Sequence, residues 1–426
     1  MLVIDAVFDK IYKLRDVAGL ERIIVVRPSD GLGFLKKRLY KLLHVKKVKL
    51  PTNDGRVVLW EDFIANSYFY QGSFYEERGA EDLAVILYSG GTTGAPKGIL
   101  LSNLNFNALG IMATTVIKQA KPGATVLSIL PIFHGFGLGV CVHTPLCKGM
   151  GCILIPVFSR KQFADIIRKN EPSFIAGVPT LFESLISSKM GPKDLKSVTS
   201  VICGGDALTV TLRDNVNKFL GEHGSDAKIR VGFGLTEGTA AVCLSPEDEF
   251  DDGIIGAPLP DTYMKIVKIG TYQQAKVGEE GEMCVSGPTI MMGYLDDEAE
   301  TAQAIRLHED GKLWLHTGDV GYLGKDGLFY FTQRLKRIIV SSGYNIYPTY
   351  LESVINSHEA VLTSTVIGID HAHKGQVAKA FIVLKPGYKA GKKLEKEIRE
   401  LLERHVAIYA LPVAYEFRDK LPTTGW

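Results

Sequence analysis

Between about residues 83 and 234, hydrophobic residues gather in short uninterrupted runs instead of alternating with polar residues. Such runs are typical of strands buried on both faces, and the helical stretches between them predict a parallel sheet covered by helices. The predicted strands are residues 83–89, 125–133, 151–156, 174–179, 200–205 and 229–234. Ligands of such sheets bind at the carboxyl ends of the strands. Because several runs end in Gly, Ser, Thr or Pro, we expect loops shaped around a ligand there.

The pattern changes near residue 250 and again near residue 334. The runs first become shorter, and Gly-Lys-Asp-Gly at 324–327 predicts a hairpin. Two helices and two strands follow, at residues 348–358, 361–369, 377–384 and 394–406. We therefore predict an α/β protein with a large N-terminal domain, 1–333, of helix-covered and largely parallel sheets plus a small antiparallel barrel at about 250–333. We predict that residues 334–426 form a second, small and mobile α+β domain.

Composition narrows the class of protein. Hydrophobic residues make up 46% and charged residues 23% of the 426 residues, which excludes disorder for most of the chain. A formal net charge of +2 provides no field that would favour nucleic acid. The six cysteines form no C-x-x-C pair and mostly sit in apolar runs, which predicts reduced thiols in a cytoplasmic protein.

A basic stretch near the N-terminus has two interpretations. Its cations alternate with Leu and Val and are Lys36, Lys37, Arg38, Lys41, Lys46, Lys47 and Lys49. A solvated helix face is the favoured interpretation. A patch that docks on acidic lipids, and hence peripheral membrane contact, is the alternative.

A glycine-rich segment carries the clearest chemistry. Residues 88–98 read Tyr-Ser-Gly-Gly-Thr-Thr-Gly-Ala-Pro-Lys-Gly and begin in a predicted strand. Backbone N–H groups and hydroxyls in such a loop can surround a polyphosphate, with Lys97 as a point charge. The segment is not a Walker A loop, because Gly98 stands where that motif needs Ser or Thr. The candidate phosphate-binding residues are Ser89, Gly90, Gly91, Thr92, Thr93, Gly94 and Lys97.

This segment closely resembles the phosphate loop of the adenylate-forming superfamily, which includes acyl-CoA synthetases, luciferases and carrier-protein adenylation domains. Four further segments resemble that family's motifs in the right order. They are Gly-Gly-Asp-Ala-Leu at 204–208, Gly-Phe-Gly-Leu-Thr-Glu-Gly at 232–238, Thr-Gly-Asp at 317–319 and Arg-Leu-Lys at 334–336. The resemblance covers almost the whole chain.

The resemblance implies a reaction in which a carboxylate attacks the α-phosphate of ATP, and a thiol then displaces AMP from the acyl-adenylate. It implies that Lys97 and its loop hold the β- and γ-phosphates, that Thr236 binds the α-phosphate and that Glu237 holds Mg²⁺, a cation that prefers carboxylate oxygen. The other implied roles are adenine binding by Gly205, Asp206, Phe233 and Gly234, ribose binding by Asp319 and Arg334, and a hinge at Lys336.

His134 lies in Pro-Ile-Phe-His-Gly-Phe-Gly, residues 131–137. A histidine beside aromatic residues is commonly a hydrogen-bonded structural residue. The segment also resembles the family's aromatic gating motif, in which such a histidine borders the acyl and thiol paths. Both interpretations stay open, with His134 as a candidate catalytic residue. The other histidines show no metal-ligand spacing.

The substrate prediction rests on which side chains are missing. Amino-acid-activating relatives usually place an aspartate after the His134 segment, but residues 136–145 contain no acid, and a buried ammonium without a partner is costly. Small residues at 176–178, 204–205, 232 and 234 leave room for an apolar tunnel. The resemblance is closest to long-chain fatty acid–CoA ligases, with fatty acid, ATP and coenzyme A as small-molecule partners.

Two alternatives remain: a medium-chain or aryl acid–CoA ligase, and an inactive nucleotide- or acyl-binding fragment. The second arises because relatives carry a further stretch before the region matching Met1, and a Gly-Lys pair after the segment that ends here at Trp426. On that comparison the chain is expected to be truncated at both ends.

Overall fold

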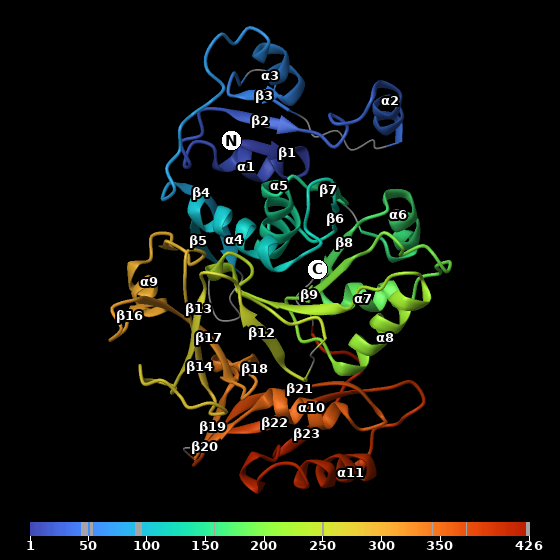
Figure 1. Cartoon of the computed structure of the whole chain (residues 1–426), viewed down its shortest axis with the longest axis vertical. Coiled ribbons are helices and arrows are strands. Elements are labelled where there is room, and N and C mark those ends of the chain that lie inside the picture. The colour runs from blue at the N-terminus through green and yellow to red at the C-terminus, as the bar shows by residue number, and fades with distance from the viewer. Residues whose placement is uncertain are drawn as a thin grey trace. The chain divides into compact units, whose positions relative to one another are not determined.

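The computed structural model describes residues 1–43, 50–51, 54–89, 96–156, 158–248, 251–342, 344–371 and 373–422 (Figure 1). The chain divides into two compact units, Met1–Glu77 and Arg78–Trp426. The predicted boundary at Arg334 falls inside the second unit and stays a prediction. Lys46, Lys47 and Lys49 of the basic stretch lie outside the described residues.

The first unit is a three-stranded parallel sheet with helices between its strands. Its elements are β1 (Leu2–Ile4), α1 (Phe8–Leu14), β2 (Ile23–Val26), α2 (Phe34–Leu43), β3 (Val57–Leu59) and α3 (Trp60–Ser67). The core consists of Val3, Phe8, Ile23 and Val25, all buried. Alternate residues of β2 therefore face the core, as expected for a strand with one covered face.

Five parallel strands form the centre of the second unit, in the order β10-β9-β8-β6-β7. They are β6 (Thr125–Ser128), β7 (Gly151–Leu154), β8 (Phe174–Gly177), β9 (Ser200–Gly204) and β10 (Ile229–Phe233). Each begins at its predicted first residue and ends one to five residues early. The extra residues form the loops at the carboxyl edge, which confirms the expected parallel arrangement.

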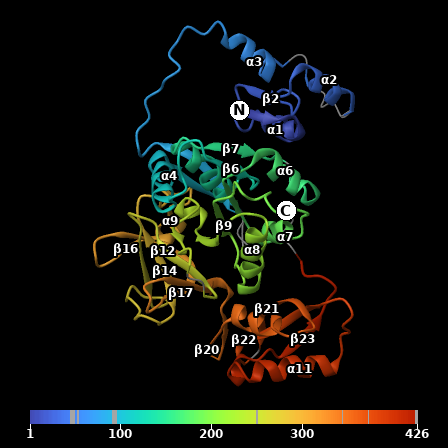
Figure 2. The same ribbon diagram turned by 45° about the vertical axis from the view of Figure 1, so that its right-hand side comes forward.

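Both faces of this sheet are buried, which explains why its strands are apolar throughout. Helices α6 (Phe163–Asn170), α7 (Pro179–Ile186) and α8 (Val210–Glu222) cover one face, where they pack on Ile175 and Val201. Helix α4 (Asn103–Val116) covers the other face and packs in one cluster with Ala176 and Ile202. Figures 1 and 2 show these helices around the sheet.

The strand at 83–89 does not join the parallel series, contrary to the prediction. β4 (Leu83–Ser89) pairs antiparallel with β5 (Lys97–Ser102), and β5 pairs with β15 (Gly293–Tyr294) in a separate three-stranded sheet. The physical reason is chain length. A parallel crossover needs a dozen or more residues, whereas the segment between Ser89 and Lys97 is far shorter and permits only a hairpin.

The antiparallel strands continue from the parallel sheet. They are β11 (Cys243–Leu244), β12 (Ile254–Pro258), β13 (Tyr263–Val267), β14 (Gly281–Ser286), β16 (Ile305–Leu307), β17 (Leu313–Leu323) and β18 (Phe329–Arg334). β11 pairs with β10, and β12 links β11 to β18, so the described strands form one twelve-stranded sheet. β17 and β18 form the predicted hairpin around 324–327.

The last part of the chain is an α+β module with its own buried core. It contains β19 (Ile339–Ser341), β20 (Tyr344–Ile346), α10 (Pro348–Asn356), β21 (Val361–His371), β22 (Gly375–Leu384), α11 (Lys392–Glu403) and β23 (Ala414–Phe417). Leu394, Ile398 and Leu402 of α11 are buried at helical spacing and pack in one cluster with the sheet. The predicted helices and strands are present within a few residues of their expected bounds.

Two further findings concern cysteines and membranes. All six cysteines are free, and Cys141, Cys203, Cys243 and Cys284 are buried. Across the described ranges, every helix is too short or too polar to cross a bilayer.

Candidate active site

Three of the candidate adenine-binding residues, Gly205, Phe233 and Gly234, lie at the carboxyl edge of β9 and β10. Gly204 and Gly232 are register partners, and a Cβ on Gly204 would lie 2.7 Å from the carbonyl oxygen of Gly232. Gly205 has a φ of +80°, a conformation that favours glycine. The backbone is therefore closely packed at Gly204, and the turn at Gly205 favours a residue without a side chain.

The segment after β10 folds back tightly on itself. A Cβ on Gly234 would meet the carbonyl oxygen of Ala240 at 1.9 Å, so only glycine fits. Thr239 and Ala240 have φ values of 52° and 78°, which are unusual for residues with side chains. Thr239 is held by a hydrogen bond from its Oγ1 to the carbonyl oxygen of Thr289, at 2.6 Å. Strain of this kind clusters at functional sites.

Tyr294 connects two of the predicted phosphate-site residues. Its hydroxyl donates a hydrogen bond to Glu237 Oε1 at 3.0 Å, and Lys97 Nζ lies 5.1 Å from its ring centroid. Burial raises the pKa of Tyr294, and the charge of Glu237 adds to the rise, so the phenol stays protonated as a donor. The backbone also joins these segments, since Met291 N donates to the carbonyl oxygen of Glu237 at 2.9 Å.

Lys97 forms an ion pair with Glu300 of α9 (Glu298–Ala304). Both side chains are about one-third exposed, so the pair contacts solvent and exchanges readily for another anion. Register pairing places Ser89 directly opposite Lys97, at the two ends of the glycine-rich segment. Gly90, Gly91, Thr92, Thr93 and Gly94 lie outside the described residues.

Asp319 and Arg334 are register partners on β17 and β18. Asp319 is 4% exposed, while the Arg334 side chain is 71% exposed and its Nε lies 3.4 Å from Asp319 Oδ1. Burial raises the pKa of Asp319 to about 6; Arg334 opposes the rise, and the charges of Glu237 and Glu282 add to it. Asp319 is therefore a buried acid close enough to Glu237 and Glu282 for their charges to raise its pKa.

His134 reaches the same sheet edge through its neighbours. Phe136 lies against Gly204, since a Cβ there would contact its ring at 3.2 Å, and Gly135 lies near Ala240. His134 Nδ1 accepts a hydrogen bond from Phe136 N at 3.2 Å, so the neutral ring carries its proton on Nε2. Partial burial lowers the pKa of His134, which favours this neutral form.

Two candidates stand apart from this group. Asp206 is exposed, and its Oδ1 accepts a hydrogen bond from Ala207 N at 2.8 Å. Lys336 is exposed in the short helical turn η5 (Leu335–Arg337), just after Arg334. Within the described ranges no hydrogen bond or ion pair joins either side chain to the other candidates, so their roles stay predictions.

Sequence reasoning missed Tyr294 and Glu300. Glu300 lies 203 residues from Lys97, in an acidic stretch that looks like ordinary solvated surface. The positive φ of Thr239 and Ala240 left no sign either, since neither residue type favours it. Tyr294 reaches the site because the short Gly293–Tyr294 strand pairs with β5. No local sequence pattern indicates that pairing.

Comparison with known proteins agrees with this geometry. The sequence model described as AMP-binding enzyme matches residues 9–295, and that of the AMP-binding enzyme C-terminal domain matches residues 350–425. The chain is 34% identical over 440 residues to a long-chain-fatty-acid–CoA ligase of Bacillus subtilis (strain 168), which covers 100% of this chain and 74% of that protein.

Other relatives carry names that refer to luciferin and to feruloyl-CoA. A luciferin 4-monooxygenase of Nipponoluciola cruciata is 31% identical over 80% of this chain and 61% of its own length. A feruloyl-CoA synthase of Amycolatopsis is 30% identical over 82% of this chain and 68% of its own length.

Solved structures share the fold. ATP-bound MatB from Rhodopseudomonas palustris has a TM-score of 0.78 at 24% identity, covering 98% of this chain and 78% of that chain. An anthranilate CoA ligase in complex with anthranoyl-AMP has a TM-score of 0.78 at 22% identity, covering 99% of this chain and 75% of that chain. Together with the two family matches and the identity to the Bacillus protein, these likenesses show that the chain belongs to the AMP-binding enzyme family, within the adenylate-forming superfamily.

Proposed function

We propose that this protein joins a fatty acid to coenzyme A in two steps with ATP. The carboxylate oxygen attacks the α-phosphorus of ATP, the bond to the bridging oxygen breaks and pyrophosphate leaves. The coenzyme A sulfur then attacks the acyl carbon, its thiol proton is lost and AMP leaves. The family and the grouping of Lys97, Glu237, Tyr294 and Asp319 support the adenylating step.

The residues of this chain position and neutralise charge rather than forming covalent bonds. Lys97 would leave Glu300 to bind the β- and γ-phosphates, and the Thr236 hydroxyl would donate to the α-phosphate. Glu237 fits Mg²⁺, because its carboxylate offers hard oxygen and Tyr294 hydrogen-bonds Oε1. When bound there, Mg²⁺ would neutralise polyphosphate charge. His134 would donate from Nε2 toward the reacting carboxylate.

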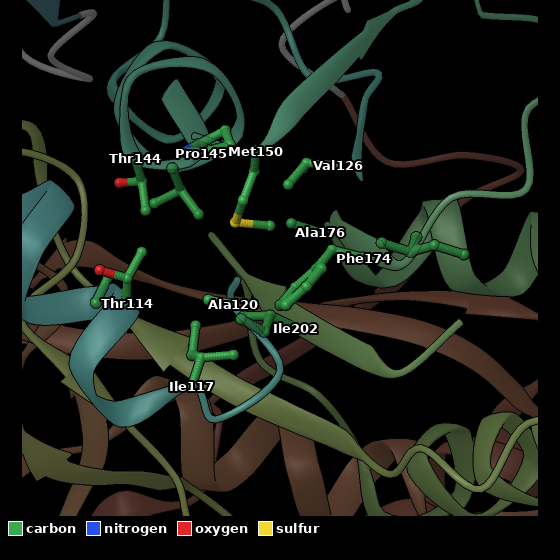
Figure 3. Close-up of a pocket in the computed structure, with 13 residues that line it drawn as sticks. Thr114, Ile117, Ala120, Val126, Thr144, Pro145, Met150, Phe174, Ala176 and Ile202 are labelled. Atoms are coloured by element: carbon green, nitrogen blue, oxygen red, sulfur yellow. The ribbon is translucent and has the colours of Figure 1, made fainter. Parts of the chain in front are cut away.

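An apolar cavity beneath the sheet edge, together with the similarity to a long-chain-fatty-acid–CoA ligase, supports the assignment of a fatty acid. Its volume is about 40 Å³, and α4, β6, β8, β9 and the segment at 140–150 line it (Figure 3). Charged side chains are absent from its lining, which includes Ala113, Ala176 and Ile202. Ile202 lies two residues before Gly204, so the cavity wall is roughly 7 Å from the carboxyl edge. Hydrocarbon is the chemistry that such a lining accepts.

The direct test incubates the full chain with ATP, coenzyme A and one acid from a panel of acetate, octanoate, palmitate and ferulate. AMP and acyl-CoA are quantified together. We expect palmitate to give equal amounts of both products at the highest kcat/KM. Preference for ferulate or octanoate would support the aryl or medium-chain alternative. Nucleotide binding without acid-dependent AMP release would identify a binding module and contradict the proposal.

Filling the cavity should select against long acids. Ala113 lies on α4 and lines the cavity, and Leu is also a good helix former, so Ala113→Leu adds bulk with little loss of helix propensity. Overpacking costs ~1–3 kcal/mol, so kcat/KM for palmitate should fall about 10-fold while that for acetate is unchanged. Gly205 is a poorer position for this test, because its φ of +80° strains any side chain.

Ala108→Leu is the matched control for cavity filling. Ala108 is buried on the same helix but does not line the cavity. It should shift the melting temperature as much as Ala113→Leu without changing the ratio of palmitate to acetate activity. Equal losses for both acids in Ala113→Leu would place the acyl chain elsewhere.

Removing the carboxylate of Glu300 should strengthen ATP use. In the free protein Glu300 holds Lys97, and its charge also repels a polyphosphate. An exposed pair of this kind is worth ~0.2–1 kcal/mol, so Glu300→Gln should lower the KM for ATP by up to about 5-fold. Steady-state kinetics with varied ATP measure this effect.

Glu298→Gln controls for the charge of the helix terminus, since Glu298 is exposed in the first turn of the same helix. Its KM for ATP should stay near the wild-type value. A raised KM in Glu300→Gln would mean that Glu300 orients Lys97 instead of competing for it.

A further inference from the structure

Three buried side chains with metal-ligating atoms converge in the antiparallel part of the sheet. Cys284 lies on β14, His316 on β17, and His308 directly after β16, and one ligating atom from each lies within 4.8 Å of the others. Cys284 and His316 are register partners, and the turn between β16 and β17 returns His308 to them. The exposed fraction is 0% for Cys284, 5% for His308 and 8% for His316.

The hydrogen bonds prepare the two imidazoles for a cation. Glu282 Oε2 lies 2.8 Å from His316 Nδ1, which places the His316 proton on that nitrogen and leaves a lone pair on Nε2. His308 Nε2 lies 2.9 Å from His316 Nε2 and donates a hydrogen bond to it, so the lone pair of His308 is on Nδ1. A carboxylate on the outer nitrogen is the usual partner of a metal-binding histidine, because it fixes the tautomer and ring orientation.

His308 supplies a second and independent observation. Its Nδ1 is buried and has no hydrogen-bond partner among the described residues. The ring centroids of Tyr272 and Trp314 lie 4.7 Å and 5.9 Å from the centroid of the His308 ring, so the surroundings of His308 are largely aromatic. A buried polar atom without a partner is costly, and a cation bound by the Nδ1 lone pair would offset this cost.

The charges around the cluster also favour a divalent ion. Glu282 is 8% exposed, and besides contacting His316 it accepts a hydrogen bond from the backbone N–H of Gly318, at 3.2 Å. The nearby Lys265 is already paired with Asp310 at 3.0 Å. A doubly charged cation with one thiolate and the Glu282 carboxylate would bring the cluster to neutrality, which reduces the cost of burying each charge.

We propose that Cys284, His308 and His316 bind one thiophilic divalent transition-metal ion, Zn²⁺ in the first place, and that Glu282 orients His316 for it. The Cys284 S–H bond breaks, a sulfur–metal bond forms and the proton leaves to solvent; each imidazole donates a lone pair and no group changes oxidation state. One thiolate and two imidazoles are ligands that suit Zn²⁺. The ion would tie β14 and the β16–β17 turn to β17.

The place of the cluster gives the ion a structural role beside the nucleotide site. Glu282 Oε1 accepts from Gly318 N, in the segment between His316 and Asp319. Metal binding to the folded state alone raises the stability of that state. We expect the loaded protein to melt at a higher temperature, and this readout does not depend on the proposed activity.

The test uses the purified full chain. Its metal content is measured by mass spectrometry, then the ion is removed with a chelator and Co²⁺ is titrated as a spectroscopic probe. The expected result is one Co²⁺ per chain with a thiolate-to-cobalt charge-transfer band, release of one proton and a melting temperature that rises with free metal. Cys284→Ser should abolish the band, and Glu282→Gln should lower metal affinity about 10–100-fold.

Cys147 provides the matched control, because its Sγ lies 3.2 Å from His143 Nε2 and it is exposed. Cys147→Ser should keep the band and the stoichiometry. Loss of the band in Cys147→Ser but not in Cys284→Ser would overturn the assignment, and so would failure of the wild-type chain to bind the ion stoichiometrically. Either failure would leave ATP-dependent ligase activity measurable, so the two proposals are tested separately.

Discussion

Lys97→Ala is expected to lower kcat/KM for ATP by about 10²–10³-fold while leaving the fold intact. One preorganised charge that stabilises the reacting phosphates is typically worth this much. The fold should survive because Lys97 is about one-third exposed and its ion pair with Glu300 contributes little stability. Steady-state kinetics, nucleotide binding by calorimetry and a thermal melt measure the three quantities.

Two further variants separate charge from geometry at this position. Lys97→Arg keeps the charge but replaces a compact ammonium by a planar fork, so it should recover only part of the activity. In the double variant Lys97→Ala/Glu300→Gln, the loss should be smaller than in Lys97→Ala, because the unpaired Glu300 no longer repels the polyphosphate. Unchanged ATP affinity in Lys97→Ala would show that the glycine-rich segment does not bind phosphate.

The central sheet could be predicted because its information is local. Phe174, Ile175 and Ala176 form an apolar run, and the structure places Ile175 against one layer of helices and its two neighbours against the other. Burial on both faces requires such a run. The partner of β4 was missed because an isolated apolar run does not specify its neighbour, and only the short distance in sequence from Ser89 to Lys97 indicates a hairpin.

The candidate site could be predicted only in part, for a similar reason. Glu237 and Asp319 were found through short motifs, although an isolated acid more often lies at the surface. Glu300 and Tyr294 meet Lys97 and Glu237 only after β15 has paired with β5. The cluster of Cys284, His308 and His316 was missed because cross-strand register, not spacing along the chain, brings those side chains together.

Asp319→Asn is expected to stabilise the fold at neutral pH. Burial raises the pKa of Asp319 to about 6 in the folded state, above the value of 3.8 for an unperturbed carboxyl. A group with a raised folded pKa contributes its full stability below about pH 4 and loses it as the pH rises through about 6. At ~1.4 kcal/mol per pKa unit, ionisation in the fold costs about 3 kcal/mol. The melting temperature of the variant should therefore exceed that of the wild type at about pH 7.5. Near pH 4 the two melting temperatures should be equal.

The same variant should lose ATP use, because only the ionised carboxylate accepts strongly from both ribose hydroxyls. Charge-assisted hydrogen bonds are worth ~1.5–3 kcal/mol, so kcat/KM for ATP should fall about 10²-fold. In the wild type, log kcat/KM for ATP should decline with unit slope below about pH 6, and Asp319→Asn should lack this limb. A variant that keeps wild-type kcat/KM, or a wild-type profile that is flat through pH 6, would exclude Asp319 from ribose binding.

Asp326→Asn is a control with the opposite sign, on the turn between β17 and β18. Hydrogen bonds from Tyr330 and from Leu328 N lower the pKa of Asp326, so its contribution to stability is present at neutral pH and lost as the pH falls through the lowered value. Asp326→Asn should therefore destabilise the fold at neutral pH and leave the KM for ATP unchanged. Opposite shifts in melting temperature for the two variants, with ATP use lost in Asp319→Asn alone, would trace the pH limb to the one buried carboxylate at the ribose position.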